Sequence, residues 1–142
     1  MKKLIMLSQL ILAIASQAAV AGPVAVIVNS ANTQNMSQAE VKNVYADKTI
    51  AWENGNKIAV YNLPPEEAAA ETFAQKILGM PARTAAADEA NRVITNVSRN
   101  TQLTKRDALV SSIVAKTPSA IGYVPKELAD GKPGIRVLFT LE

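Results

Sequence analysis

Three short polar segments hold the side chains that could bind a ligand. The first, residues 29–35, contains Ser30, Asn32 and Thr33, and it lies between an apolar run and a helix start. A loop in this position is a common ligand site in open α/β sheets. The first amides of a helix also lack partners within the helix, so they favour anions. Ser30, Asn32 and Thr33 are therefore candidate ligand contacts, with an ordinary solvated turn as the alternative.

The other two segments lie further along the chain. Asn62 belongs to the corner at residues 61–65, where a strand turns into a helix, and such a corner is a usual ligand position in an α/β protein. Arg99 and Thr101 lie in the polar loop 98–102, which has no apolar residue. A guanidinium can hold an oxyanion through two parallel hydrogen bonds. A solvated loop arginine is the alternative at Arg99.

The residue types disfavour catalysis. The chain has no cysteine and no histidine, which excludes a Ser-His-Asp triad and metal sites built from thiolates or imidazoles. The available carboxylates, Asp47, Glu53, Glu66 and Glu67, occupy predicted turns and helix starts, where such groups usually serve solvation and capping. We therefore predict a binding protein that is not an enzyme and that uses no metal or cofactor.

The N-terminus predicts export. Lys2 and Lys3 precede a mostly apolar stretch that ends in the small residues of segment 19–21. This pattern is typical of a secretory signal peptide, with cleavage after Ala21. The apolar run is interrupted by polar residues and is shorter than the roughly 20 apolar residues of a spanning helix, which disfavours a membrane anchor. We expect residues 22–142 to form one periplasmic or secreted domain that does not span the membrane.

Charge and composition exclude nucleic acid as a partner. The chain has 15 basic and 12 acidic residues, so its net charge is small. Aromatic residues make up only 4% of the chain, too few for a platform that stacks bases.

Hydrophobic periodicity predicts alternating strands and helices. Ser37 and Glu40 form a capping box, Pro64 and Pro65 suit a first helical turn, and Gly79 ends a helix. Trp52 should pack its ring on the domain and place its N–H near a carbonyl or solvent. The predicted strands are 24–28, 57–61, 120–124 and 135–141. The predicted helices are 37–45, 64–78, 83–97, 108–115 with Thr104 as N-cap, and a single turn at 125–129.

These elements predict an α/β fold with a mixed sheet of about four strands flanked by helices. The helix at 83–97 should be buried through one apolar face. That face consists of Ala86, Ala90, Val93 or Ile94, and Val97.

Four segments stand out together: MSQAEVKNVY at 36–45, KTIAWENG at 48–55, FAQKILGM at 73–80 and TPSAIGYV at 117–124. They resemble segments of a known family, the phosphate-type periplasmic substrate-binding proteins. Together they cover most of residues 22–142 in the family's order. The resemblance implies a type 2 periplasmic-binding-protein fold in a single phosphate-binding-type domain, and it implies a role with an ABC transporter.

The resemblance implies a comparison with the larger members of this family, in which phosphate lies in a cleft between two lobes. A loop after the first strand holds it, here Ser30 and its neighbours, together with an arginine and a Gly-Ser-Gly-Thr segment after a later strand. Here residues 62–67, Asn-Leu-Pro-Pro-Glu-Glu, stand at that second position. Prolines have no amide to donate, and Glu66 and Glu67 repel an anion.

Two functions follow from these patterns. The first is an exported solute-binding-like protein that binds phosphate or a similar small oxyanion for an ABC transporter. The alternative is a ligand-free periplasmic interaction or sensory module that regulates an envelope or membrane partner.

Overall fold

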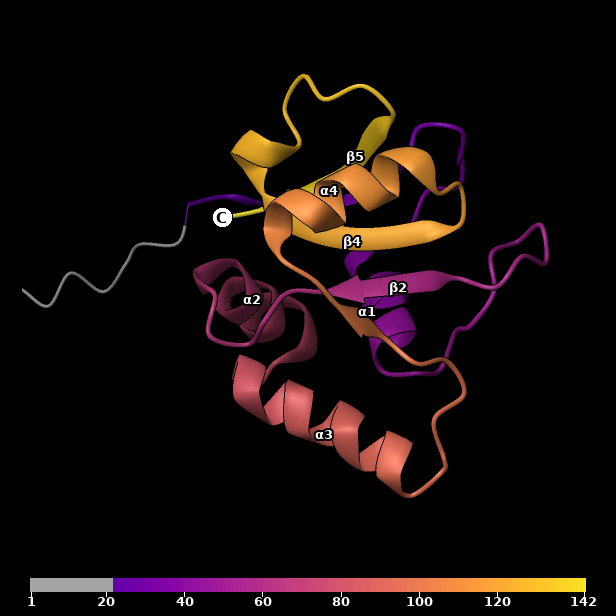
Figure 1. The fold of residues 1–142 in the computed structure, drawn as a ribbon, viewed down its shortest axis with the longest axis vertical. Coiled ribbons are helices and arrows are strands. Elements are labelled where there is room, and N and C mark those ends of the chain that lie inside the picture. Colours follow the sequence, from indigo (N-terminus) through magenta and orange to yellow (C-terminus); the bar gives the residue numbers. More distant parts are fainter. Residues whose placement is uncertain (1–21) are drawn as a thin grey trace, which may run out of the picture.

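A computed structural model of the chain describes residues 22–142. The predicted signal peptide, residues 1–21, lies outside the described residues. Five strands form one sheet in the order β3-β2-β4-β1-β5. Figure 1 shows β2, β4 and β5 of this sheet. The strands are β1 (Val24–Asn29), β2 (Ala59–Asn62), β3 (Leu103–Thr104), β4 (Ala120–Pro125) and β5 (Ile135–Leu141).

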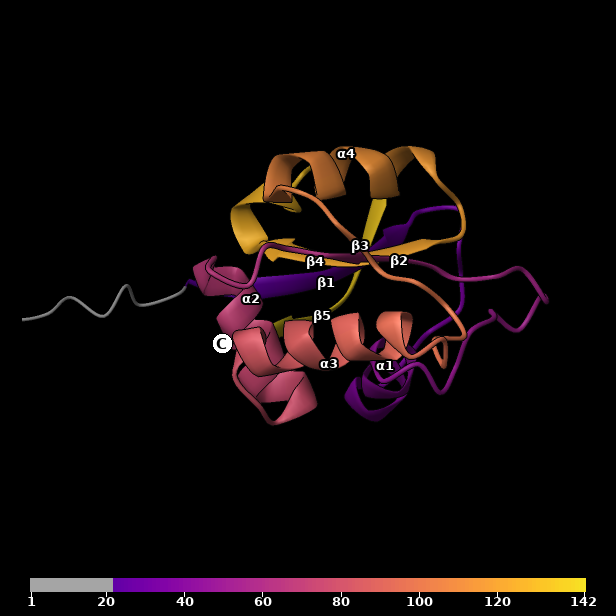
Figure 2. The ribbon, with the colours of Figure 1, turned by 60° about the horizontal axis from the view of Figure 1, so that its bottom comes forward.

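Helices cover both faces of this sheet. The helices are α1 (Gln38–Tyr45), α2 (Ala68–Phe73), α3 (Ala82–Ile94) and α4 (Asp107–Lys116). The π-helical segment η1 (Ala74–Leu78) continues α2, and the 3-10 turn η2 (Lys126–Leu128) follows β4. Figure 2 shows α4 on one face, and α1, α2 and α3 on the other. The predicted α/β fold with a mixed sheet is confirmed, with the two-residue β3 as an additional strand.

Strand β1 is the centre of the core. All six of its residues are buried, which fits a β-branched run with helices on both faces. It pairs antiparallel with β4 on one side and with β5 on the other. Strand β2, in contrast, runs parallel to both β3 and β4. The sheet is therefore mixed, and β1 runs opposite to the β3-β2-β4 group.

Several local predictions are confirmed. Ser37 Oγ accepts a hydrogen bond from the Glu40 amide at 3.2 Å, so it caps α1. Gly79 has a φ of 70°, a left-handed conformation that glycine adopts without strain, and the helix ends there. Trp52 is 4% exposed, and its indole N–H donates to the Ser119 carbonyl at 2.8 Å.

Two helix starts differ from the prediction. Pro64 and Pro65 do not open α2. They lie in a turn closed by the Glu67 amide on the Pro64 carbonyl at 3.0 Å, and the helix begins at Ala68. Thr104 is not an N-cap, because it lies in β3 and pairs with Asn62 of β2. Helix α4 begins at Asp107. At Thr104, pairing along the sheet competes with the local helix signal.

The predicted buried face of α3 is wrong. Ala82 is the only residue of α3 that is fully buried. Ala86 and Ala90 are exposed, and the exposed fractions of Val93, Ile94 and Val97 are 45%, 81% and 61%. The apolar periodicity is present in the sequence, but Ala86, Ala90, Val93 and Ile94 line an open cavity instead of packing into the core.

The contact of α4 with β4 depends on Gly122. A Cβ added there would lie 2.6 Å from Val110 Cγ1 of α4, closer than such atoms can approach. We expect Gly122→Ala to lower the free energy of unfolding by about 1–3 kcal/mol, the usual cost of overpacking a core. Urea denaturation measures this, with Gly22→Ala, which has open space around its new methyl group, as the matched control. Equal urea midpoints for the two variants would contradict the packing argument.

Candidate functional site

The strand directions separate the predicted site residues into two groups. Because β1 is antiparallel to β4, the loop after β1 lies at the end of the sheet where β4 begins. Because β2 and β3 run parallel with β4, Asn62 and Thr104 lie at the opposite end. The candidate residues after β1 and those after β2 therefore do not converge. Each end of the sheet has a cavity of its own.

The first cavity, about 530 Å³, lies beside the loop after β1. We call it the amide basin, because carboxamide side chains dominate its walls. Asn32 and Thr33, both predicted as ligand contacts, line it together with the turn around Trp52 and Ser119. The carboxamide residues of the basin are Asn32, Gln34, Asn35, Asn54 and Asn56.

Hydrogen bonds fix the orientation of four of these amides. Oδ1 of Asn32 accepts from the Gln34 amide at 3.0 Å, and Oε1 of Gln34 accepts from the Glu53 amide at 2.9 Å. Oδ1 of Asn54 accepts from the Asn56 amide at 2.9 Å, and Oδ1 of Asn35 accepts from the Arg136 guanidinium at 2.9 Å. Since every oxygen is engaged, the NH2 groups remain as donors, and none of the four has an acceptor within residues 22–142.

Arg136 of β5 lies behind this loop. Its Nε donates to the Asn32 carbonyl at 2.9 Å, and its Nη2 donates to the Gln34 carbonyl at 2.5 Å. One guanidinium thus holds the backbone of the loop and the side chain of Asn35, and it brings a positive charge to the back of the basin. Sequence reasoning missed Arg136, because it lies in the final strand, far along the chain from the loop it binds. Its position beside apolar neighbours carries no signal of that contact.

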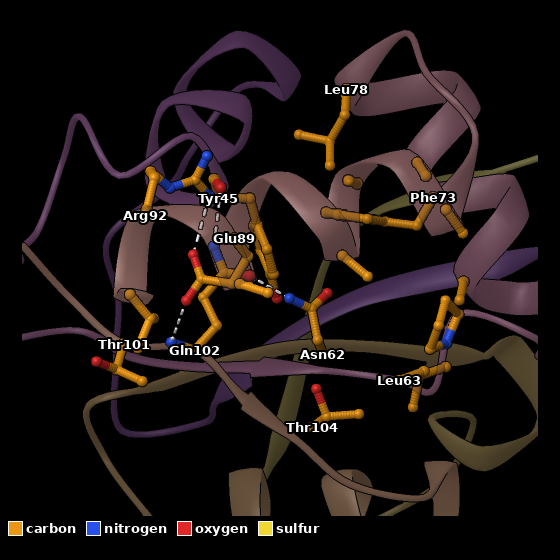
Figure 3. Close-up of a pocket in the computed structure, with 18 of the residues that line it drawn as sticks. Tyr45, Asn62, Leu63, Phe73, Leu78, Glu89, Arg92, Thr101, Gln102 and Thr104 are labelled. Atoms are coloured by element: carbon orange, nitrogen blue, oxygen red, sulfur yellow. Dashed lines mark hydrogen bonds and ion pairs between the residues drawn. The ribbon is translucent and has the colours of Figure 1, made fainter. Parts of the chain in front are cut away.

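The second cavity, about 370 Å³, lies at the other end of the sheet. We call it the corner cavity. It is bounded by α2 and η1, by α3, and by the carboxyl ends of β2 and β3 (Figure 3). Asn62 and Thr101, both predicted as ligand contacts, line it.

The polar groups at the floor of the corner cavity satisfy one another. Asn62 donates to Gln102 Oε1, and its Oδ1 accepts from the Tyr123 hydroxyl at 2.8 Å. Gln102 then donates to the Tyr45 carbonyl at 2.8 Å (Figure 3). Burial raises the pKa of Tyr123 and of Tyr45 well above the usual value, so both phenols stay neutral. Asn62 is therefore a structural connection between strands as well as a wall of the cavity.

The helix starts at this end carry negative charge. Partial burial and the neighbouring carboxylates of Asp107 and Glu66 raise the pKa of Glu67, while Arg106 opposes the shift. This arrangement disfavours an anion at the start of α2, as residues 62–67 predict from the sequence.

Ser30 and Arg99 line neither cavity. The Ser30 amide donates to the Gly134 carbonyl at 2.9 Å. The Arg99 amide donates to Asp47 Oδ2 at 2.6 Å, and its guanidinium donates to the Lys48 carbonyl at 3.2 Å. Asp47 Oδ1 accepts the next amide, that of Asn100, at 2.8 Å. Arg99 thus takes part in a clamp that attaches loop 98–102 to the end of α1.

Two kinds of feature are absent from residues 22–142. No group of three or more His, Cys, Asp or Glu residues there could hold a metal ion. No helix there is long and apolar enough to cross a membrane.

The chain has a three-layer architecture with a mixed five-stranded sheet. Three solved structures share it. A possible phosphate binding protein from Planctomyces limnophilus DSM 3776 has a TM-score of 0.61 at 17% identity, covering 83% of this chain and 42% of that one. A putative phosphate ABC transporter substrate-binding protein with bound phosphate from Clostridium perfringens has a TM-score of 0.58 at 18% identity, covering 81% and 43%.

An ABC-type phosphate transport receptor from Vibrio cholerae has a TM-score of 0.51 at 16% identity, covering 81% of this chain and 44% of that one. The chain thus spans less than half the length of these similar structures. No family model matches the sequence, and no curated protein matches it. The similarity to these three structures confirms the predicted α/β fold of the periplasmic-binding-protein type.

Glu67 and Glu71 should affect stability with opposite signs. Folding raises the pKa of Glu67, so its ionised form opposes folding at neutral pH. Glu67→Gln should therefore stabilise the protein at about pH 7. This advantage should be lost at about pH 3, where the Glu67 carboxyl is protonated in both states. Hydrogen bonds from the Ala82 amide and Gln75 lower the pKa of Glu71, so Glu71→Gln should destabilise at neutral pH and converge with the wild type in acid. Thermal melts across this range measure both. The same sign for both variants would contradict the assigned environments.

Proposed function

We propose that this chain is an exported, non-catalytic solute-binding lobe that binds phosphate or a similar small oxyanion in the amide basin and serves an ABC-type membrane transporter. The observation that carries the proposal is the set of four oriented amides in front of Arg136. The names of the solved neighbours support the ligand class and the transporter, because two describe phosphate transport and one contains bound phosphate.

The chemistry of the basin suits an acceptor-rich ligand. Oriented N–H donors stabilise an anion without reorganising when it binds, which makes them effective even where they are uncharged. The Arg136 guanidinium adds a positive field behind the loop. Glu53, which also lines the basin, opposes an anion. A single open face that combines amide donors and the Arg136 charge with the opposing Glu53 carboxylate should bind an oxyanion weakly, with a Kd on the order of millimolar.

The length of the lobe also leads us to expect weak binding. Because the chain covers 42–44% of the neighbouring structures, it supplies one face of a two-sided site at most. Full affinity would then need a second lobe, a second copy or the transporter itself. The absence of histidine and cysteine supports the non-catalytic part of the proposal.

Phosphate titration followed by ¹H–¹⁵N NMR tests the basin. We expect saturable shifts at Thr33, Asn35 and Asn54. Glu53→Gln should tighten binding about three- to tenfold because it removes a repulsive charge. Glu127→Gln, a matched change at the other end of the sheet in η2, and Arg99→Ala should leave the titration unchanged. Loss of the response in Arg99→Ala, or no saturable shift in the wild type, would reject the amide basin as the anion site.

Export has a test of its own. When the full chain is expressed in a Gram-negative host, we expect the protein in the periplasmic fraction with Gly22 as its first residue, because segment 19–21 has the small residues that signal peptidase requires. Intact mass spectrometry identifies the new terminus, and Ala21→Arg is the control that should block processing. A cytoplasmic protein that keeps residues 1–21 would contradict this part of the proposal.

The second candidate function is a ligand-free periplasmic interaction or sensory module. The exposed Val93 and Ile94 at the end of α3, with the exposed Val97 shortly after it, favour it, since large apolar side chains gathered on a surface often mark a contact site. An absent phosphate response, combined with cross-links from this end of α3 to an envelope protein, would replace the first function with this one.

A further inference from the structure

The corner cavity exists because α3 presents small side chains to it. The residues of α3 that line it include Ala82, Ala85, Ala86 and Ala90, which are too short to fill the space between α3 and the sheet. Its volume of about 370 Å³ lies at the lower end of the range typical of small-molecule pockets. Val93 and Ile94 continue the apolar wall to the exposed end of the helix.

The opposite wall is aromatic and rigid. Phe73 stacks on Tyr123 with ring centroids 3.9 Å apart and an interplanar angle of 3°. Tyr45 meets the edge of Phe73 at 4.7 Å. The Tyr45 hydroxyl donates to the Tyr61 carbonyl at 2.7 Å, so this ring cannot swing into the cavity without losing a hydrogen bond. The wall is thus held in place before any ligand arrives.

The charges around the cavity cancel. Glu89 and Arg92 pair at 2.9 Å, with 15% and 26% of their side chains exposed. Glu89 also accepts the Gln102 amide at 3.1 Å (Figure 3). Asn62 and Gln102 are already satisfied, as described above. Thr101 and Thr104 lie at the exposed edge of the cavity, and neither hydroxyl has a hydrogen-bond partner within residues 22–142. Arg92 Nε is buried and has no hydrogen-bond partner within residues 22–142, but the charge of Arg92 is paired with that of Glu89. A charged ligand would therefore find no unpaired counter-ion here, while a neutral one with a single polar group would find a donor.

We propose that the corner cavity is a binding site for a small uncharged molecule with an aromatic or branched aliphatic body and one hydroxyl or carbonyl group. The body lies between the alanines of α3 and the aromatic wall, and the polar group contacts Thr101 or Thr104. The site is separate from the amide basin, because the two cavities lie at opposite ends of the sheet. A single lobe would thus bind two ligands of different chemistry.

The probe for this site is 4-methylphenol, which is neutral and has the required shape. Titration of the full protein, followed by ¹H–¹⁵N NMR, should give saturable shifts at Ala86, Gln102 and Thr104 and leave Asn35 and Asn54 unmoved. Benzoate and benzylamine, similar in size but charged, should bind at least about tenfold more weakly. Equal binding of either ion would overturn the neutral ligand class.

A matched pair of substitutions on α3 locates the probe. Ala85→Leu fills the cavity and should weaken 4-methylphenol binding at least about tenfold, whereas Ala87→Leu, on the same helix but outside the cavity, should change it less than about twofold. Ala90→Leu serves as a second filling variant if Ala85→Leu does not fold. Equal binding by a folded filling variant and by Ala87→Leu, or no saturable shift in the wild type, would overturn the proposal. Neither result depends on whether phosphate binds.

Discussion

The direction of β1 is the constraint on which the site architecture depends. Its six buried residues make it the centre of the core, and its antiparallel pairing with β4 places its carboxyl end away from those of β2 and β3. The loops after β1 and β2 then open at opposite ends of the sheet. A protein with an all-parallel sheet would bring these loops together at one end. Here the fold separates them, and each end can therefore have its own chemistry.

Each end is organised by one set of polar contacts between segments that are distant in the chain. At the β1 end, Arg136 joins the final strand to the loop 32–35 and thereby orients the amides of the basin. At the other end, Asp47 holds loop 98–102 through the amides of Arg99 and Asn100, and this loop leads into β3. Asp47 itself has a φ of 64°, a conformation that aspartate tolerates better than most residues. Both sets connect segments far apart in the chain, so they couple the loops to the folding of the whole domain.

Local patterns were sufficient for most elements of the fold. The capping of α1 by Ser37, the helix end at Gly79 and the buried indole of Trp52 each depend on neighbours within a few residues or on side-chain size, and all were predicted. Strand direction was not predictable, because an apolar run has the same pattern in either direction. This explains why the family resemblance implies one anion site for Ser30 with its neighbours and residues 62–67, although these two segments lie at opposite ends of the sheet. Arg136 could not be found because its partners are distant in sequence.

The apolar face of α3 shows a different limit of sequence reasoning. Periodicity reports that a helix has an apolar stripe, but it does not report what lies opposite that stripe. On α3 the stripe consists mostly of alanines, which contribute little burial energy and leave space where larger residues would close it. The same composition that weakens the packing of α3 therefore creates the corner cavity. Since Leu or Ile at Ala85 or Ala90 would bury more apolar surface, the open cavity exists at the expense of stability, which is the usual relation between a binding site and the core around it.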